Sequence, residues 1–331
     1  MSKEERPVAG EFLKIYEPYK YQGTLEGNRS EARYLRKRTE ECRFCKKRRV
    51  ETTFGQETHL ISRLIGNNLF YSHDECNECN ELFNTFETDL AASLGAERTF
   101  NHLHPTEKAP GFESGNRNIG IKKLANENVI LHTKKENSND IKIDFALGKA
   151  EISMLTQPYR LEFVYRAILK MALAVLPAED IANYDLAFKF LLNPEAYPEL
   201  DTFKKAIVTE TTIVLARPFV QLYKRKSGVH QSCYTEHVFC LYTGYFMFQL
   251  SIPGYIEDDS LVNNTPSNLA APYYLLNTKD THDDVIVSRS VQDLNSNEII
   301  KRDISLHTEF STANLVAIDL GKDILKSLLE K

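Results

Sequence analysis

The sequence predicts an α+β protein built from two parts, and three observations support this prediction. Two Cys-x-x-Cys pairs in the N-terminal part indicate a small metal-bound module. Long apolar helical patterns and several β-branched strand patterns follow in the rest of the chain. The chain has 331 residues, whereas a single core usually stops growing beyond about 250. We therefore expect a module in residues 1–105, with its core at about 40–95, and a mixed α+β accessory domain in residues 116–331.

The two cysteine pairs, Cys42 with Cys45 and Cys76 with Cys79, predict a structural zinc site. Two thiolates separated by two residues can reach one zinc ion from a tight turn, and a second pair completes four tetrahedral ligands at about 2.3 Å. A disulfide framework is the alternative, but it is typical of small secreted chains. This chain is long and begins Met-Ser-Lys-Glu-Glu-Arg, without an apolar signal region. We therefore expect Zn²⁺ bound by the four thiolates.

The segments around the cysteines predict the order strand, strand, helix. An alternating run at residues 49–54 and a shorter one at 59–61 predict two strands. An amphipathic pattern over residues 76–94 predicts a helix that begins at the second cysteine pair. Before them we expect an irregular Tyr-rich stretch at 1–28 and a short basic helix at 30–39.

Helical geometry sorts the polar residues of the predicted helix by face. At about 100° per residue, Asn80 and Glu87 lie about 20° apart and share a face. Asp89 points to the opposite side of a straight helix. The angles therefore favour Glu87 over Asp89 as a neighbour of Asn80.

The chain resembles the zinc-stabilised branch of the HNH nuclease family, which has a ββα-metal fold. The resemblance lies in residues that occur in the family's order: Cys42, Cys45, His59, Cys76, Cys79 and Asn80. It covers about residues 40–95 and implies a stand-alone bacterial HNH protein with a large C-terminal accessory domain. It also implies that His59 is the general base and that Asn80 orients His59 or its loop.

These implied roles suit the hydrolysis of a phosphodiester bond. Neutral imidazole can take a proton from water near neutral pH. A Mg²⁺ or Mn²⁺ ion held by oxygen ligands supplies positive charge to the scissile phosphate. Many family members place an acid directly before the histidine, where this chain has Thr58. The candidate ligands for this catalytic ion are Glu87, by its helix face, Asp89, by the family's spacing, and Glu57, with His73 and Asp74 as further ones.

A basic segment surrounds the first cysteine pair. Ten basic residues against three acidic ones give residues 29–49 a balance of +7, although the whole chain carries −5. Such a segment is typical of contact with a phosphate backbone, and a solvated charged face is the alternative. The candidate nucleic-acid contacts are Arg36, Lys37, Arg38, Lys46, Lys47, Arg48 and Arg49.

The accessory part is predicted to mix helices and strands. Residues 128–146 have the pattern of a hairpin with a polar tip, and Cys233 and Cys240 are expected to be buried thiols. Helices are predicted at 159–176, 178–192 and 312–330, and strands at 211–216, 235–252, 273–276, 284–288 and 299–306.

The family resemblance implies a metal-dependent endonuclease that hydrolyses double-stranded DNA. The accessory domain is expected to control substrate choice or activation, as in restriction or phage-defence nucleases. A non-catalytic zinc-dependent nucleic-acid-binding protein is the alternative from another functional class. A homo-oligomer and a small-molecule or protein activator are both compatible with the sequence. No apolar run reaches the roughly 18 residues of a membrane span, so we expect no membrane partner and a cytoplasmic location.

Overall fold

The computed structural model describes most of the chain. The described residues are 9–24, 33–34, 39–55, 57–67, 69–100, 111–123, 129–133, 140–144, 146–229, 234–255, 269–271, 286–309 and 318–319. The predicted contacts Arg36, Lys37 and Arg38 and the predicted strand 273–276 lie outside them, as does Cys233. None of the described helices is both long enough and apolar enough to cross a bilayer.

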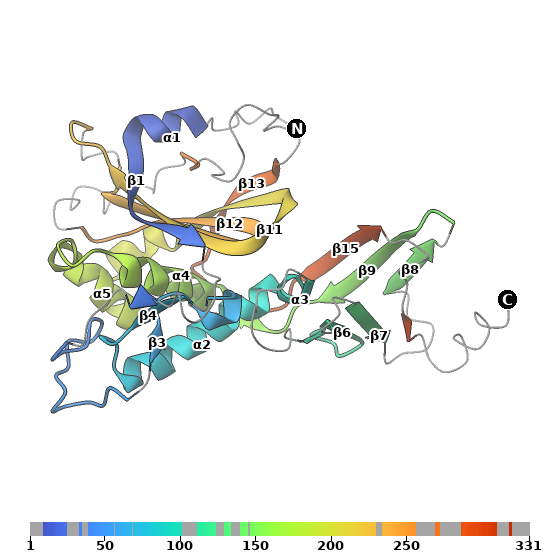
Figure 1. The fold of residues 1–331 in the computed structure, drawn as a ribbon, viewed down its shortest axis with the longest axis horizontal. Helices are drawn as coiled ribbons and strands as arrows, with labels where there is room; N and C mark the ends of the chain where they lie inside the picture. The colour runs from blue at the N-terminus through green and yellow to red at the C-terminus, as the bar shows by residue number, and fades with distance from the viewer. Residues whose placement is uncertain are drawn as a thin grey trace.

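A four-stranded antiparallel sheet forms the upper layer of the molecule (Figure 1). Its central strand is β11 (Lys205–Arg225), and β12 (His237–Ser251) pairs along one edge. On the other edge, β1 (Tyr16–Thr24) pairs with the C-terminal half of β11 and β13 (Ile286–Asp293) with the N-terminal half. Strands from both ends of the chain therefore complete one sheet.

Two helices lie directly beneath this sheet (Figure 1). Helix α4 (Leu161–Val175) is apolar on nearly every face, which is typical of a helix surrounded by other elements. It contacts β11, β12 and α5 (Asp185–Leu192). A short 3₁₀ turn at Ile181–Tyr184 connects α4 to α5, and two more, at Pro194–Ala196 and Pro198–Phe203, connect α5 to β11.

The predicted module lies on the far side of α4 from the sheet. Helix α2 (Asn77–Leu94) packs along α4, and β3 (Thr58–His59) pairs antiparallel with β4 (Phe70–Ser72). A two-residue strand, β2 (Arg33–Tyr34), adds in parallel to β4. The apolar side chains of α2, α4 and β12 belong to one continuous hydrophobic cluster. The module and the accessory part therefore contribute to one hydrophobic cluster.

Small sheets extend from this body (Figure 1). One has the strand order β16-β7-β6-β5, another β15-β9-β8, and β10 pairs with β14. Helix α3 (Glu97–Phe100) follows α2. The strand bounds are β5 (Phe112–Glu113), β6 (Ile119–Lys123), β7 (Val129–Thr133), β8 (Ile141–Asp144), β9 (Lys149–Leu155), β10 (Tyr159–Arg160), β14 (Ile299–Ile300), β15 (Asp303–Glu309) and β16 (Ile318–Asp319).

Several predicted elements need correction. Residues 9–24 form α1 (Ala9–Ile15) and β1 instead of an irregular stretch, because β1 finds its partner in the distant β11. The strands of the predicted hairpin 128–146 join different sheets, since β7 pairs with β6 and β8 pairs with β9. Within the predicted terminal helix 312–330, Ile318–Asp319 is a strand parallel to β7, and the remaining residues lie outside the described part.

The strand predicted at residues 49–54 is a series of turns. The amides of Glu51 and Thr52 both bond to the carbonyl of Arg48, and Arg49 N bonds to Glu40 O. These turn bonds use the backbone groups that a strand ladder would need. The first strand of the module's core at about 40–95 is therefore β3, which contains His59, and the second, β4, falls where no strand was predicted. The predicted helix 76–94 is confirmed as α2, and 159–176 as α4 with two residues of strand before it.

Candidate metal centre and adjoining histidine

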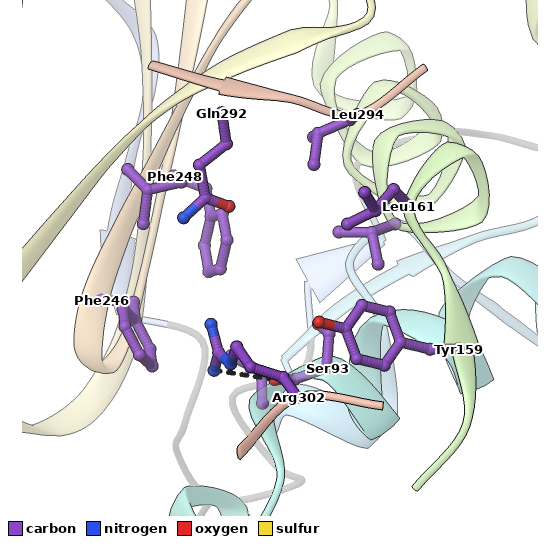
Figure 2. A pocket seen from close by; sticks show the side chains of 11 residues that line it. Ser93, Tyr159, Leu161, Phe246, Phe248, Gln292, Leu294 and Arg302 are labelled. Carbon is purple, nitrogen blue, oxygen red and sulfur yellow. Dashed lines mark hydrogen bonds between the residues drawn. The ribbon is translucent and has the colours of Figure 1, made fainter. Parts of the chain in front are cut away.

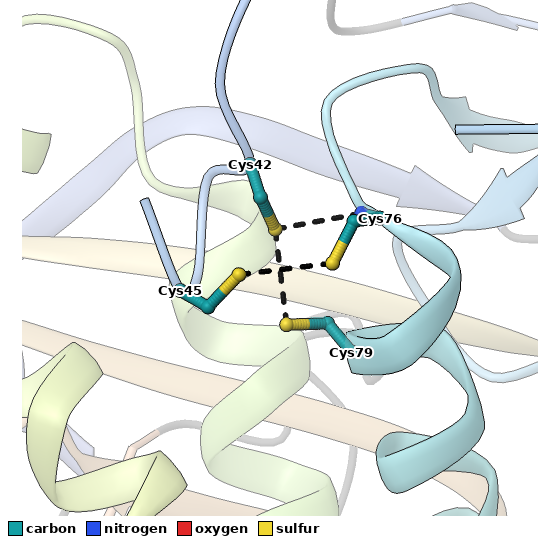
Figure 3. A group of neighbouring side chains, drawn as sticks. All are labelled: Cys42, Cys45, Cys76 and Cys79. Carbon is teal, nitrogen blue, oxygen red and sulfur yellow. Dashed lines mark hydrogen bonds between the residues drawn. The ribbon is translucent and has the colours of Figure 1, made fainter. Parts of the chain in front are cut away.

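The four cysteines of the two pairs converge on one point (Figure 3). Their sulfur atoms all lie within 4.8 Å of one another. The Sγ atoms of Cys42 and Cys79 are 3.8 Å apart, and those of Cys45 and Cys76 are 3.7 Å apart. A regular tetrahedron with zinc–sulfur bonds of about 2.3 Å has edges of about 3.8 Å. The donor set therefore fits a four-coordinate zinc ion.

Local geometry brings each pair into place. The first pair lies on a turn in which Lys46 N bonds to Cys42 O, and Lys46 adopts a φ of 61° to reverse the chain. The second pair straddles the start of α2, where Cys76 is the N-cap and Cys79 lies in the first turn. The amide of Cys76 also donates to Cys42 Sγ at 3.4 Å. A zinc ion here would fix the first residue of α2 against the preceding turn.

The thiol environment favours a bound cation. Three of the four cysteines are buried, and Cys45 is half-buried. Burial raises the pKa of Cys45 to about 11, whereas the hydrogen bond with Cys79 lowers the pKa of Cys42 to about 5. Four sulfurs this close cannot all ionise without a compensating positive charge, because thiolates repel one another. A divalent ion allows all four to become ligands.

His59 lies on β3, opposite Tyr71 of β4, and the two ring centroids are 4.7 Å apart. Burial, together with the positive charge of Lys170, lowers the pKa of His59 to about 4. The imidazole is therefore neutral at pH 7. Its Nδ1 is buried and has no hydrogen-bond partner within the described chain. This nitrogen is able to accept a proton or a hydrogen bond, and the lowered pKa makes it a weaker base than a free imidazole.

The side chain of Lys170 reaches from α4 into the module beside His59. Its Nζ donates to the carbonyl of His59 at 2.7 Å and to Glu87 Oε1 at 3.2 Å. Glu75 Oε2 lies 3.6 Å away, and all three ionisable side chains are buried. Burial raises the pKa of Glu75 to about 8. Lys170 therefore links the accessory part to three places in the module: β3, the start of α2 and the middle of α2.

Asp89 on α2 also pairs with a cationic residue of the accessory part, Arg160. Its Oδ2 accepts from the backbone N of Arg160 at 3.0 Å and from its Nε at 2.9 Å. Asp89 and Glu87 are both buried, although the straight-helix angles place them on different faces. The structure thus gives both acids a role in docking α2 against α4. Their role as ligands of a catalytic metal stays a prediction.

The remaining predicted residues differ in burial and in hydrogen bonding. Asn80 follows Cys79 in α2 and is half-buried, and Glu57 is exposed just before β3. Thr58, at the position where the family often has an acid, is buried and donates from Oγ1 to Ser72 O at 3.2 Å. Asp74 accepts from the Ser72 hydroxyl and lies 3.8 Å from Arg43. Asp74 is therefore part of the fold's own polar network.

Asn67, which the sequence analysis did not single out, organises the β3–β4 connection. Its buried amide donates to the carbonyls of Ile61 and Phe70 at 2.7 and 3.0 Å. Its Oδ1 accepts from the amides of Leu69 and Phe70 at 3.1 and 3.0 Å. One side chain thus holds both sides of the loop. The Gly66-Asn67 pair was a usable signal, because asparagine often replaces backbone partners in turns.

The described basic residues divide into buried and exposed ones. Arg43 is buried and donates to the carbonyls of Leu173 and Leu176 at the end of α4. Lys46 and Arg48 are exposed on the turn. Lys47 is exposed but forms an ion pair with Glu78, and Arg49 lies over the ring of Phe54. Lys46 Nζ also lies 5.2 Å from the centroid of the Phe188 ring, so Arg48 offers the freest surface position among the described candidates for nucleic-acid contact.

Comparison with known proteins adds no assignment, since no family, no curated protein and no solved structure matches this chain. The centre is therefore described by its own geometry: a tight four-cysteine cluster at the start of α2, with a neutral histidine on β3.

Proposed function

We propose that this protein is an HNH-type endonuclease that hydrolyses phosphodiester bonds in double-stranded DNA. The observation that carries the proposal is the order β3, β4, α2, with neutral His59 on the first strand and the four-cysteine cluster at the start of the helix. This order matches the ββα arrangement that the resemblance of the sequence implies. The zinc ion is proposed to be structural, because four thiolates leave it no open position.

His59 is proposed to take a proton from the water that attacks the phosphorus atom. Its imidazole is neutral, and Nδ1 has no partner among the described residues. Lys170 and the strand pairing hold the backbone of His59 from both sides. Asn80, in the first turns of α2, is proposed to orient the loop that presents His59. Positioning of this kind favours proton transfer when the acceptor lies within about 3 Å of the water.

A hard divalent ion such as Mg²⁺ or Mn²⁺ would supply positive charge to the scissile phosphate. The predicted ligands do not form a ready site for it. Glu87 is paired with Lys170 and Asp89 with Arg160, so only Glu57 of the three is exposed. The donor set is incomplete in this arrangement, and the cleavage proposal therefore rests on His59.

The second candidate function is zinc-dependent nucleic-acid binding without cleavage. The pairing of Glu87 and Asp89 with cations favours it, because a structural module needs no metal-binding acids. Exposed Lys46 and Arg48 suit contact with phosphates in either case. In both readings the accessory part is proposed to control substrate choice or activation, and a role in restriction or phage defence would follow from cleavage of foreign DNA.

The two functions are separated by incubating zinc-loaded protein with supercoiled plasmid in Mg²⁺ or Mn²⁺. We expect cleavage by the wild type and its loss in His59→Ala, with DNA binding retained in a gel-shift assay. His132→Ala, which removes a histidine of β7 outside the module, is the matched control and keeps activity. Unchanged cleavage by His59→Ala contradicts the assignment of His59. Binding with no cleavage by any of the three proteins favours the second function.

A further inference from the structure

The end of α2 borders two spaces of different size. The gap between α2, the start of α4 and the sheet, drawn in Figure 2, has about 30 Å³, which is enough for water but not for an organic ligand. A larger space of about 260 Å³, open to solvent, lies between the last turn of α2, Arg98 and Thr99 of α3, residues 111–113 and Gln157. We call this space the α2–α3 cavity.

The α2–α3 cavity lies well away from the cysteine cluster. Ala91, on its wall, is 12 residues beyond Cys79 in α2, which corresponds to about 18 Å at 1.5 Å per residue. None of the residues considered above for zinc, catalysis or nucleic-acid contact lines it. The cavity is therefore separate from the site already described.

Gly95 forms the corner at which the cavity opens. It directly follows α2 and has a φ of 60°, in the left-handed region that favours glycine. A Cβ atom at this position would lie 2.5 Å from Ile304 Cδ1, so the close packing also requires glycine. The chain turns here, and α3 follows. The wall formed by Ala91, Ala92 and Gly95 has only small side chains, which leaves room beside Arg98.

Arg98 brings a positive charge to the cavity. Its Nε donates to the carbonyl of Leu64 at 2.7 Å, which fixes the guanidinium group. Nη1 and Nη2 have no hydrogen-bond partner within the described chain, and Arg98 forms no ion pair with a described carboxylate. The residue is half-buried, and burial lowers its pKa to about 10, so the group stays charged at pH 7. Charged groups withdrawn from water are usually paired. An anion in the cavity would supply the missing partner.

The other lining residues suit a compact polar ligand. Gln157 Nε2 donates to the carbonyl of Glu113, which orients the amide, and its Oε1 has no partner among the described residues. This oxygen can accept a hydrogen bond from a hydroxyl or amino group. Phe112 is buried and forms an apolar wall. The Glu113 side chain is exposed, and it does not contribute to the pKa shift of Arg98, so it leaves the charge of Arg98 uncompensated.

We propose that the α2–α3 cavity binds a compact organic oxyanion, whose negative group lies against Nη1 and Nη2 of Arg98. Guanidinium offers two parallel donors to carboxylate and phosphate oxygens. A hydroxyl or amino group of the same ligand bonds to Gln157 Oε1. The volume lies below the roughly 300–1,000 Å³ of sites for drug-sized ligands, so the ligand has few carbon atoms. Small phosphate esters and small carboxylic acids share this chemistry. The proposal does not depend on nuclease activity, because it rests on other residues.

Isothermal titration calorimetry on the full-length zinc-loaded protein tests the site. The probes are glycerol 3-phosphate, 3-phosphoglycerate, malate and inorganic phosphate. We expect at least one probe to bind, and about tenfold weaker binding by Arg98→Gln, because hydrogen bonds to a charged group contribute about this much. Ala92→Leu fills the cavity from α2 without changing a charge and is expected to weaken binding at least as much. This second variant decides the test if Arg98→Gln does not fold.

Two control variants match these changes. Arg117→Gln removes an exposed arginine that follows β5 and does not line the cavity, and Thr88→Leu adds the same bulk to an exposed position one turn earlier in α2. Both are expected to bind the probe as the wild type does. Tighter binding of glycerol 3-phosphate than of malate identifies a phosphate ester as the ligand class, and the reverse identifies a carboxylic acid. Binding of no probe, or wild-type affinity in folded Arg98→Gln or in Ala92→Leu, overturns the proposal.

Discussion

Two clusters of side chains along α2, the cysteines at its start and the acidic residues at its middle, differ in how they are assembled. At the start of α2, four cysteines from two short motifs form the candidate zinc centre. At the middle of the same helix, Glu87 and Asp89 meet Lys170 and Arg160, which come from the accessory part. The first cluster depends on spacing within each motif, and the second on how α4 packs against α2. The difference shows that acids on a helix face can serve docking where a nuclease motif would suggest metal binding.

The largest expected effect is the loss of the cysteine cluster. Cys42→Ser removes one of four ligands, and structural zinc contributes roughly 10–16 kcal/mol of apparent binding free energy in small zinc modules. We expect loss of the zinc, measured by elemental analysis, and loss of cooperative thermal unfolding. Cys240→Ser, which alters a buried thiol outside the cluster, is the control and should retain zinc. Full zinc content in Cys42→Ser would contradict the assigned centre.

The helix-face cluster is tested by Lys170→Met. This change keeps an unbranched side chain that is one atom shorter but leaves Glu75 and Glu87 buried without their cation. Removing one partner of a buried ion pair typically costs about 3–5 kcal/mol, so we expect a fall of that size in the free energy of urea unfolding. Lys189→Met removes an exposed pair with Asp185 on α5 and should cause no measurable change. Equal stability of the two variants would show that Lys170 does not hold the module in place.

Asn67→Ala tests the loop that carries β3 into β4. The change leaves the carbonyl of Ile61 and the amides of Leu69 and Phe70 without their side-chain partner. Unsatisfied buried groups cost about 1–3 kcal/mol each at most, and partial relaxation reduces the sum, so we expect about 2–3 kcal/mol of destabilisation in urea. Zinc content should remain unchanged, because the cysteines lie elsewhere. Loss of zinc would mean that the loop and the metal centre form together.

A smaller effect on the free energy of unfolding, which depends on pH, is expected from the buried His237 of β12. His237 is fully buried, its Nδ1 lies 2.7 Å from the Tyr184 hydroxyl, and burial lowers its pKa to about 4. In the unfolded chain its pKa is about 6.5, so the unfolded state binds more protons between these values. Stability contributed by neutral His237 is therefore present above about pH 6.5 and is lost as the pH falls toward 4.

The comparison of wild type with His237→Gln isolates this effect. Between pH 7 and pH 5 the wild type should lose about 2 kcal/mol more unfolding free energy than the variant, which has no titrating group there. Urea unfolding at the two pH values measures the difference. Identical losses in both proteins would mean that His237 can be protonated in the folded state at pH 5.

Elements supported by local patterns were predicted well. The helix over 76–94 begins at its cysteine and ends at Leu94, because its apolar stripe and its length are both contained in the segment. The apolar helix at 159–176 is confirmed for the same reason. Strands were predicted less well, because β7 pairs with β6 and β8 pairs with β9, and no local pattern specifies these partners. Strand pairing depends on contacts distant in sequence, and the long β11 gathers three partners from across the chain.

The four cysteines that could hold a metal ion, and the helix that begins at the second pair, followed from the sequence alone, because thiol spacing and helical periodicity are properties of short segments. The sequence also singled out His59, although its catalytic role stays a prediction. The pairing of Glu87 with Lys170 and of Asp89 with Arg160, and the bonds from Arg43 to the end of α4, became visible in the three-dimensional packing alone. The physical reason is that a buried charge must find its partner through packing, and that partner lies more than seventy residues away in each case.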